Sequence, residues 1–279
     1  MAIELVTKYL PYVDEQFSQE SKTAILTNQD FTFDGANTVK IYKVTTGSMN
    51  DYGRGGAAAG NWSRYGAVES LDATTETFTL RKDRSFTFAI DKLDQDETQQ
   101  QLEAATALGR QIREVVTPEI DTYVLGKICD GAGTKPAAKA LTKANLYTEI
   151  ITAGKVMDDA LVPETGRVLV VTPEIYFIMK QCPEIVMETE IGNDMRIRGV
   201  IGNLDGMSVL KIPAARLPEN FGFAVVHPCA TCAPMKLESY RTHEDPPGIS
   251  GSLVEGRVVY DAFVMENKVK GIYYQEVTE

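Results

Sequence analysis

The sequence predicts an α+β protein in which a long β-hairpin and a long helix accompany a compact block of mixed helices and strands. Alternating aromatic and aliphatic residues over 31–41 and 78–90 indicate two extended stretches. Apolar residues spaced three and four apart over 102–128 predict the helix. Short apolar runs from residue 141 onwards indicate the compact block.

The amino-acid composition argues against several classes of function. The chain has 279 residues, 28 Lys and Arg against 39 Asp and Glu, and a net charge of −11. This charge argues against a main task of gripping nucleic acid, which depends on clustered cations. His227 and His243 are the only histidines, which removes most histidine-based metal and acid–base schemes. Composition therefore favours a structural part over a catalyst, with no cofactor.

The apolar runs and the cysteines indicate the compartment. The longest apolar stretches fall far short of the roughly 20 residues of a membrane span, and residues 1–30 lack the pattern of a secretory signal. Four cysteines are too few for a disulfide-stapled scaffold of this length. We expect reduced thiols, no membrane contact and a protein made soluble inside a cell.

Residues 1–29 have the composition of an arm. A few aromatic and aliphatic side chains are interrupted by Pro11 and followed by Ser, Gln and Thr. Such a segment becomes ordered only against something else.

The two extended stretches predict a projecting two-stranded arm over 30–92. Between them, 47–66 carries six glycines and three successive alanines. A tip of this composition buries too little apolar area to offset its ordering entropy. Lys82 and Arg84 occupy inward positions of the second stretch, so that face must be partly wet. Because an isolated two-stranded arm is marginal in water, we expect a partner chain beneath it.

The long helix has a recognisable start, bend and end. Anionic side chains precede it, where the helix dipole favours them: Asp91, Asp94, Asp96 and Glu97. Its apolar stripe includes Leu102, Leu108, Ile112 and Val115. Pro118 should bend or interrupt the helix, because it lacks an N–H and crowds the preceding turn. Gly131 and Gly133 should end it.

The remaining chain predicts alternating helices and strands. We expect a helix over 143–159, a buried strand over 167–172 and a short helix opened by Pro173. Further strands are predicted over 200–201, 207–212 and 221–226, followed by a loop over 242–252. The last strand pair is predicted over 257–265 and 269–275, joined by a turn at Asn267 and Lys268.

Two motifs resemble the major capsid proteins of tailed phages, which have the Hong Kong 97-type fold. They are Phe86 to Thr98 (FTFAIDKLDQDET) and Thr117 to Tyr123 (TPEIDTY), similar to the end of that family's extended loop and the spine helix it enters. The element order resembles the family over the whole chain. The resemblance implies the following organisation: an N-terminal arm (1–29), an extended loop hairpin (30–92), a spine helix with peripheral domain (93–142), an axial domain (143–240), and a loop with returning peripheral strands (241–279).

The resemblance implies a structural protein rather than an enzyme. Such a chain self-assembles through hexamers and pentamers into the icosahedral head shell of a phage, is assembled in the host cytoplasm and resides in the virion capsid. It encloses double-stranded DNA without sequence-specific binding, and scaffold, portal and decoration proteins are possible partners. Some family members begin with a cleaved scaffolding segment of about a hundred residues, whereas here the arm starts almost immediately. A same-fold nanocompartment shell enclosing an enzyme cargo is the closest alternative.

The glycine-rich tip supplies the candidate contact residues. Arg54, Trp62, Arg64 and Tyr65 are expected to touch a neighbouring copy, since aromatic residues and Arg are enriched in interfaces. Contact of the same residues with nucleic acid is the alternative. Gly53 to Gly56 lacks the strand-to-helix context and the Lys-Ser/Thr of a phosphate loop.

One motif allows a chemical alternative. Cys229 and Cys232 form half of a zinc deaminase signature, and a hydrolase or deaminase would need a His-x-Glu upstream that the chain lacks. A structural zinc held with His227 and His243 fits none of the usual spacings. Two small thiols at a strand end are the simpler interpretation. Lys40, Lys43 or Lys82 could form an intersubunit crosslink, but no motif identifies a pair.

Overall fold

The computed structural model describes residues 21–28, 38–44, 46–56, 62–67, 69–93, 104–182, 185 and 202–278. The chain divides into two compact units. One is the hairpin unit, Phe33–Leu80, and the other is the body, which combines Met1–Thr32 with Arg81–Glu279.

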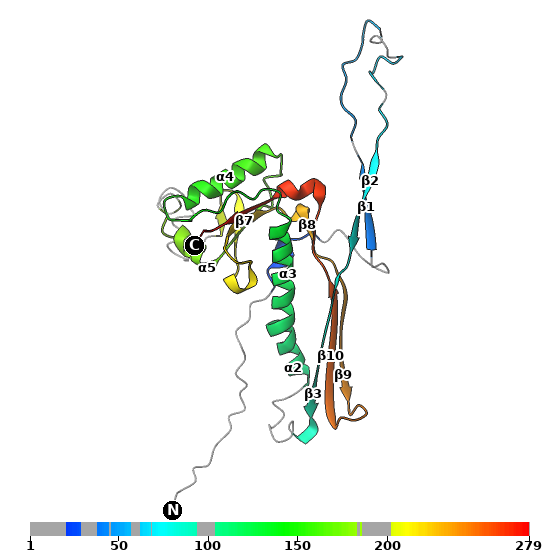
Figure 1. The fold of residues 1–279 in the computed structure, drawn as a ribbon, viewed down its shortest axis with the longest axis vertical. Coiled ribbons are helices and arrows are strands. Elements are labelled where there is room, and N and C mark those ends of the chain that lie inside the picture. The colour runs from blue at the N-terminus through cyan, green and yellow to red at the C-terminus, as the bar shows by residue number, and fades with distance from the viewer. Residues whose placement is uncertain are drawn as a thin grey trace, which may run out of the picture. The chain divides into compact units, whose positions relative to one another are not determined.

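A five-stranded sheet forms one half of the body (Figure 1). Its strand order is β12 (Ile272–Glu276), β7 (Phe221–Val226), β4 (Val168–Val171), β6 (Met207–Lys211) and β5 (Asn203–Leu204). Only β4 and β6 pair in parallel; the other neighbours are antiparallel. The outer edge of β12 is covered by the segment 134–139, which hydrogen-bonds to it through Thr134 and Lys139. The predicted strand over 200–201 lies outside the described residues.

Helices cover both faces of this sheet. On one face, Leu169, Val171 and Phe223 pack with α4 (Leu146–Asp159) and α5 (Pro173–Met179). On the other, Val170 and Ala224 pack with α3 (Thr117–Asp130). Successive residues of a strand point to opposite faces, so each strand contributes to both clusters. The Thr172 hydroxyl accepts from the Ile175 N–H at 3.2 Å and caps α5, which begins at Pro173 as predicted.

The long helix is continuous but not uniform (Figure 1). It consists of α2 (Ala104–Gln111), a π-helical turn over Ile112–Val116 and α3. Pro118 lies in the first turn of α3, directly after the π turn, so the helix changes its hydrogen-bonding pattern next to Pro118 but is not interrupted there, contrary to one of the two predicted outcomes. The helix ends at Asp130 before Gly131, as predicted. None of the helices in the described part of the chain is long and apolar enough to cross a membrane.

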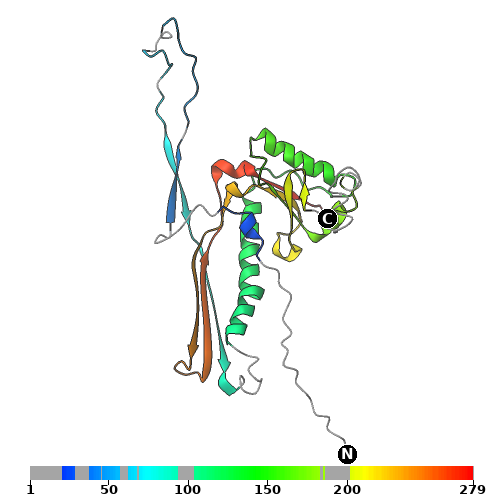
Figure 2. The ribbon, with the colours of Figure 1, turned by 180° about the vertical axis from the view of Figure 1, so that it is seen from behind.

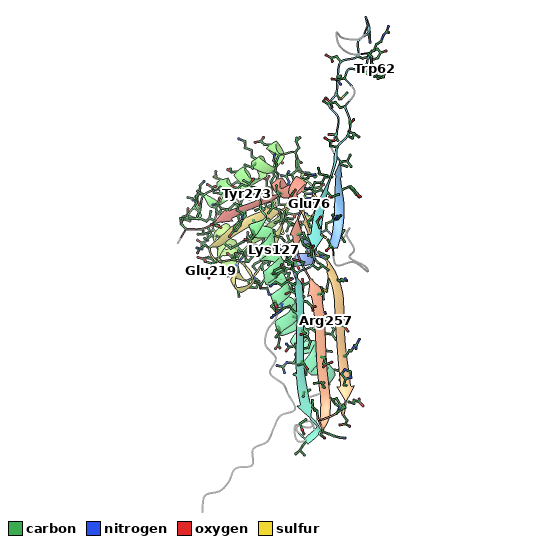
Figure 3. The ribbon with its side chains drawn as sticks, turned by 45° about the vertical axis from the view of Figure 1, so that its right-hand side comes forward. Trp62, Glu76, Lys127, Glu219, Arg257 and Tyr273 are labelled. Carbon is green, nitrogen blue, oxygen red and sulfur yellow. The ribbon has the colours of Figure 1, made fainter. Side chains whose placement is uncertain are left out.

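A three-stranded antiparallel sheet forms the other half of the body. Its order is β3 (Lys82–Asp91), β10 (Gly251–Tyr260) and β9 (Met235–Glu244). Tyr260 packs edge-on against Tyr123 of α3, with ring centroids 5.6 Å apart. Arg257 points the other way and forms an ion pair with Asp83 on the exposed face (Figure 3). The long helix thus packs against this sheet through α2 and through Tyr123 of α3, and against the five-stranded sheet through buried residues of α3.

The predicted hairpin over 30–92 is wrong in its second strand. Residues 73–79 form β2, which pairs with β1 (Thr38–Val44), but 82–91 form β3, which pairs with β10. The Asp261 carboxylate accepts from the Arg81 N–H at 2.9 Å and marks this change of sheet. The ammonium group of Lys82 lies over the Tyr123 ring, which explains how a charged side chain is accommodated at the start of β3. Residues 31–37 lie outside the description.

The predicted C-terminal hairpin is also wrong. β10 pairs with β3 and β9, whereas β12 pairs with β7. A 3₁₀ helix over Glu266–Gly271 replaces the expected turn, and β11 (Phe263–Val264) pairs with β8 (Thr231–Cys232). The predicted loop over 242–252 shortens to 245–250, because β9 extends to Glu244 and β10 starts at Gly251. β9 was missed because polar residues occupy both of its faces.

The four cysteines are free, as expected for reduced thiols. Cys129, Cys182 and Cys232 are buried, while Cys229 is half-buried. Burial, reinforced by the neighbouring Asp130 carboxylate, raises the pKa of Cys129 to about 12. Cys129 is therefore an unreactive thiol at neutral pH.

Substitutions at two glycines test the backbone conformation at the start of β10. Gly251 has a φ of +141°, and an added Cβ would lie 2.1 Å from the Ile90 carbonyl oxygen, whereas Gly109 in α2 has open space. We expect Gly251→Ala to lower the free energy of unfolding by at least about 1–3 kcal/mol. The matched Gly109→Ala should raise it by about 0.5–1 kcal/mol. Urea unfolding followed by circular dichroism measures both. Equal effects in the two variants would contradict the described start of β10.

Thiol labelling tests the burial of the cysteines. With N-ethylmaleimide at neutral pH, the folded protein should gain one label rapidly, at Cys229, because the other three thiols are buried. Cys229→Ser should remove this fast phase and Cys129→Ser should leave it unchanged, as measured by intact-mass spectrometry. Rapid labelling of two or more sites in the folded chain would disagree with the structure.

Candidate functional site

The hairpin formed by β1 and β2 has two unlike faces. One face carries Val39 and Phe78, which are directly paired, and the ion pair of Lys43 with Glu76 at 3.0 Å. The other face is rich in threonine, and Thr38 and Thr79 share a hydrogen bond of 3.1 Å. Phe78 is 8% exposed, so this face carries a buried aromatic side chain.

The tip of the hairpin is organised by hydrogen bonds between its two sides. The Glu69 carboxylate accepts from the N–H and the hydroxyl of Ser48, at 3.2 and 3.0 Å. Farther out, the Gly53 N–H donates to the Arg64 carbonyl at 2.9 Å. Polar contacts therefore replace the buried apolar area that the composition could not supply.

One glycine and one aromatic pair bring the two sides together. Gly66 has a φ of +95°, and a Cβ there would lie 2.6 Å from the Asn50 side chain. Only glycine fits both the conformation and the space. Next to it, the rings of Tyr52 and Tyr65 meet edge-on with centroids 5.0 Å apart. The glycine-rich composition thus serves a specific close approach.

Large apolar side chains are exposed along this hairpin. We call seven of them the hairpin surface: Tyr42, Val44, Met49, Tyr52, Trp62, Tyr65 and Leu71, each at least 50% exposed. Met49 is 99% and Trp62 is 87% exposed, and Figure 3 shows Trp62 at the outer end of the hairpin. Covering one such side chain contributes about 1.5–3 kcal/mol. Concentrations of exposed apolar residues mark interaction sites.

The residues predicted at the tip have the exposure that a contact requires. Arg54, Trp62, Arg64 and Tyr65 are all exposed. Neither arginine has an ion-pair or hydrogen-bonding side-chain partner within the described residues. Their role between copies stays a prediction.

Sequence reasoning missed the other members of the hairpin surface. They are Tyr42, Val44, Met49, Tyr52 and Leu71. An aromatic or Met inside a stretch with almost no aliphatic residues was an available signal for Met49 and Tyr52. Tyr42 and Val44 read as ordinary strand residues, and their exposure depends on contacts that a local pattern does not encode.

The predicted spine residues fall on the long helix, apart from Leu102, which lies outside the described residues. Leu108, Ile112 and Pro118 are half-buried. Val115, which lies within the π turn, is 46% exposed. Together with Phe86 and Val258, Val115 lines a cavity of about 130 Å³ between the helix and the three-stranded sheet.

The cysteines and histidines of the candidate zinc motif do not form one cluster. The Nδ1 atom of His227 accepts from the Cys229 N–H at 3.2 Å, and its Nε2 lies 3.1 Å from the Thr165 carbonyl oxygen. His243 lies on β9 beside Glu255, at 3.4 Å. In the described ranges, no group of three or more His, Cys, Asp or Glu side chains is placed to hold a metal ion. Cys232 lies at the end of β8, as a buried thiol should.

The remaining sequence candidates have structural contacts. The Asp91 carboxylate accepts from the Leu93 N–H at 2.8 Å, while Asp94, Asp96 and Glu97 lie outside the description. Lys43 is engaged by Glu76 and Lys82 by the Tyr123 ring. Gly53 to Gly56 forms a turn closed by a 3.2 Å backbone hydrogen bond.

The chain is similar in fold to solved structures from phages. No family model matches the chain, and no curated protein matches it significantly. A structure described as Mycobacterium phage Che8 has 21% identity and a TM-score of 0.79, covering 97% of this chain and 96% of that one. The capsid structure of the cyanophage P-SCSP1u has 13% identity and a TM-score of 0.79, covering 98% and 93%. The mature capsid of bacteriophage PhiM1 has 14% identity and a TM-score of 0.76, covering 99% and 92%. The chain therefore has the fold of these phage capsid structures over nearly its whole length.

Proposed function

We propose that the chain is the major capsid protein of a tailed double-stranded DNA phage and assembles into the icosahedral shell of its head. The single observation that carries the proposal is the fold match, which spans at least 97% of the chain in each comparison above. A match of this extent includes the hairpin unit as well as the body. The proposed role is structural and needs no cofactor.

The hairpin surface supports assembly through copies of this chain. Its aromatic residues and Met, together with the neighbouring Arg54 and Arg64, are residue types enriched in protein interfaces. They lie on a hairpin whose tip is held together by polar contacts. The exposed residues are therefore kept in place without an apolar core in the tip. A shell also needs large contacts with several neighbours, which favours exposed elongated elements.

The parts of the fold suggest roles within a subunit. We assign the extended loop to the hairpin unit, Phe33–Leu80, and the spine to the helix over 104–130. The five-stranded sheet with α4 and α5 would form the axial domain, and the three-stranded sheet the peripheral domain. Scaffold, portal and decoration proteins would be the further partners, and the net charge of −11 suits a wall that releases packaged phosphates.

Assembly tests the proposal directly. Electron microscopy of the purified chain should show closed shells, hexamers or pentamers. Trp62→Ala should raise the concentration needed for assembly about 30-fold, since interface residues of this kind contribute about 2 kcal/mol or more. Phe177→Ala, which removes a 63% exposed aromatic from α5, serves as the matched control with a smaller effect. A strictly monomeric chain at high concentration would refute the proposal.

Trypsin distinguishes free subunits from assembled ones. Arg54 and Arg64 are exposed, so free subunits should be cut after both residues. In particles, the same cuts should slow by at least about tenfold if neighbouring copies cover the tip. Mass spectrometry identifies the cuts, with cleavage after the exposed Lys236 as an internal reference. Equal cleavage at the tip in both states would remove it from the contacts between copies.

A further inference from the structure

The chain segment 21–28 is fixed to the body at two points; we call it the arm segment. At its start, the Asp121 carboxylate of α3 accepts from the Ser21 hydroxyl at 2.7 Å, the Thr23 hydroxyl at 3.0 Å and the Lys22 N–H at 3.3 Å. At its end, the Asn28 N–H donates to the Thr231 carbonyl at 2.7 Å. Figure 2 shows the short turn Thr23–Ile25, in blue, lying against α3.

Apolar packing supports the same segment. Leu26 is 0% exposed and belongs to the cluster that holds α3 against the five-stranded sheet. The Thr231 hydroxyl donates to the Leu26 carbonyl, which fixes the backbone between the two anchor points. The arm segment is therefore part of the body, unlike a freely projecting tail.

Asp121 has a second task. It forms an ion pair with Arg216 at 2.9 Å, and the two residues are 1% and 7% exposed. Arg216 belongs to a 3₁₀ turn, η3 (Ala214–Arg216), in the connection between β6 and β7. One buried carboxylate thus joins the arm segment, α3 and the five-stranded sheet.

The energetics link these contacts. A buried carboxylate is costly unless its lone pairs are satisfied. Of the four donors described at Asp121, three come from the arm segment and one from Arg216. If the arm segment moves away, water must replace the three hydrogen-bond donors that it gives to Asp121. The ion pair of Asp121 with Arg216 then becomes exposed to solvent. If Arg216 moves away, the donors of the arm segment surround a buried Asp121 carboxylate whose charge is no longer compensated.

We propose that Asp121 couples the docking of the arm segment to the contact between η3 and α3, so that release of either loosens the other. Such coupling is reciprocal, because both contacts draw on the same carboxylate. A neighbouring copy that pulls on the chain before Ser21 would then loosen η3 from α3. The coupling is a property of the single chain and holds whether or not the chain forms a shell.

Hydrogen–deuterium exchange of the full-length, unassembled protein tests the coupling from both ends. Arg216→Met should speed exchange in the peptide covering 21–28 about tenfold, as expected for the loss of a charged hydrogen bond. The double variant Ser21→Ala, Thr23→Val should speed exchange by a similar factor at Leu217, whose N–H donates to the Ala214 carbonyl. Arg257→Met removes an exposed ion pair on the three-stranded sheet and should change neither peptide.

The test depends on the exchange rate of the peptide that is not mutated in each variant. The proposal is overturned if Arg216→Met leaves 21–28 unchanged, or if the arm variant leaves 213–217 unchanged, because the contacts at Asp121 would then be independent. Asp121→Asn, which keeps the side chain's shape and removes its charge, provides a second route if Arg216→Met fails to fold. It should speed exchange in both peptides together, and an unchanged rate in either one contradicts the coupling.

Discussion

The packing of one helix against two different sheets is the constraint on which the rest of the body depends. Tyr123 of α3 meets Tyr260 of the three-stranded sheet, while Val124 and Ile128 lie in the cluster beneath the five-stranded sheet. The helix must therefore present apolar side chains in two directions, which a single straight stripe does not provide.

The π turn before Pro118 lies where the helix begins to contact the second sheet. A π turn adds one residue and rotates the face of the helix that follows it. α2, before the turn, lies along the three-stranded sheet, whereas α3, after it, contacts both sheets, through Tyr123 on one side and through Val124 and Ile128 on the other. The cavity of about 130 Å³ beside the turn, lined by Val115, Phe86 and Val258, is where the first stripe ends. Local irregularity thus supports the global arrangement.

Local patterns predicted the elements whose partners follow from their own sequence. The strand over 221–226, the helix that begins at Pro173 and the end of the long helix at Gly131 were all found, because apolar runs, Pro and Gly act within a few residues. Strand partners were not found, since 82–91 reads the same whether it pairs with β2 or β10. At the candidate site, Trp62 and Tyr65 stood out by residue type, whereas the exposure of Tyr42 depends on what the rest of the fold leaves uncovered. Asp121 looked like an ordinary helix residue because its partners are 95 to 100 positions away.

Polar and apolar contacts have opposite roles in the two units. In the hairpin unit, hydrogen bonds such as Ser48 to Glu69 hold the tip, and large apolar side chains remain outside. In the body, apolar clusters hold the sheets, and one buried carboxylate joins three parts of the chain. A hairpin tip held by exposed polar contacts opens at small cost, because water replaces them readily. A buried carboxylate opens only when its partners leave together. The hairpin is therefore suited to adapt to a neighbouring surface, whereas the arm segment is suited to remain fixed until a distinct event releases it.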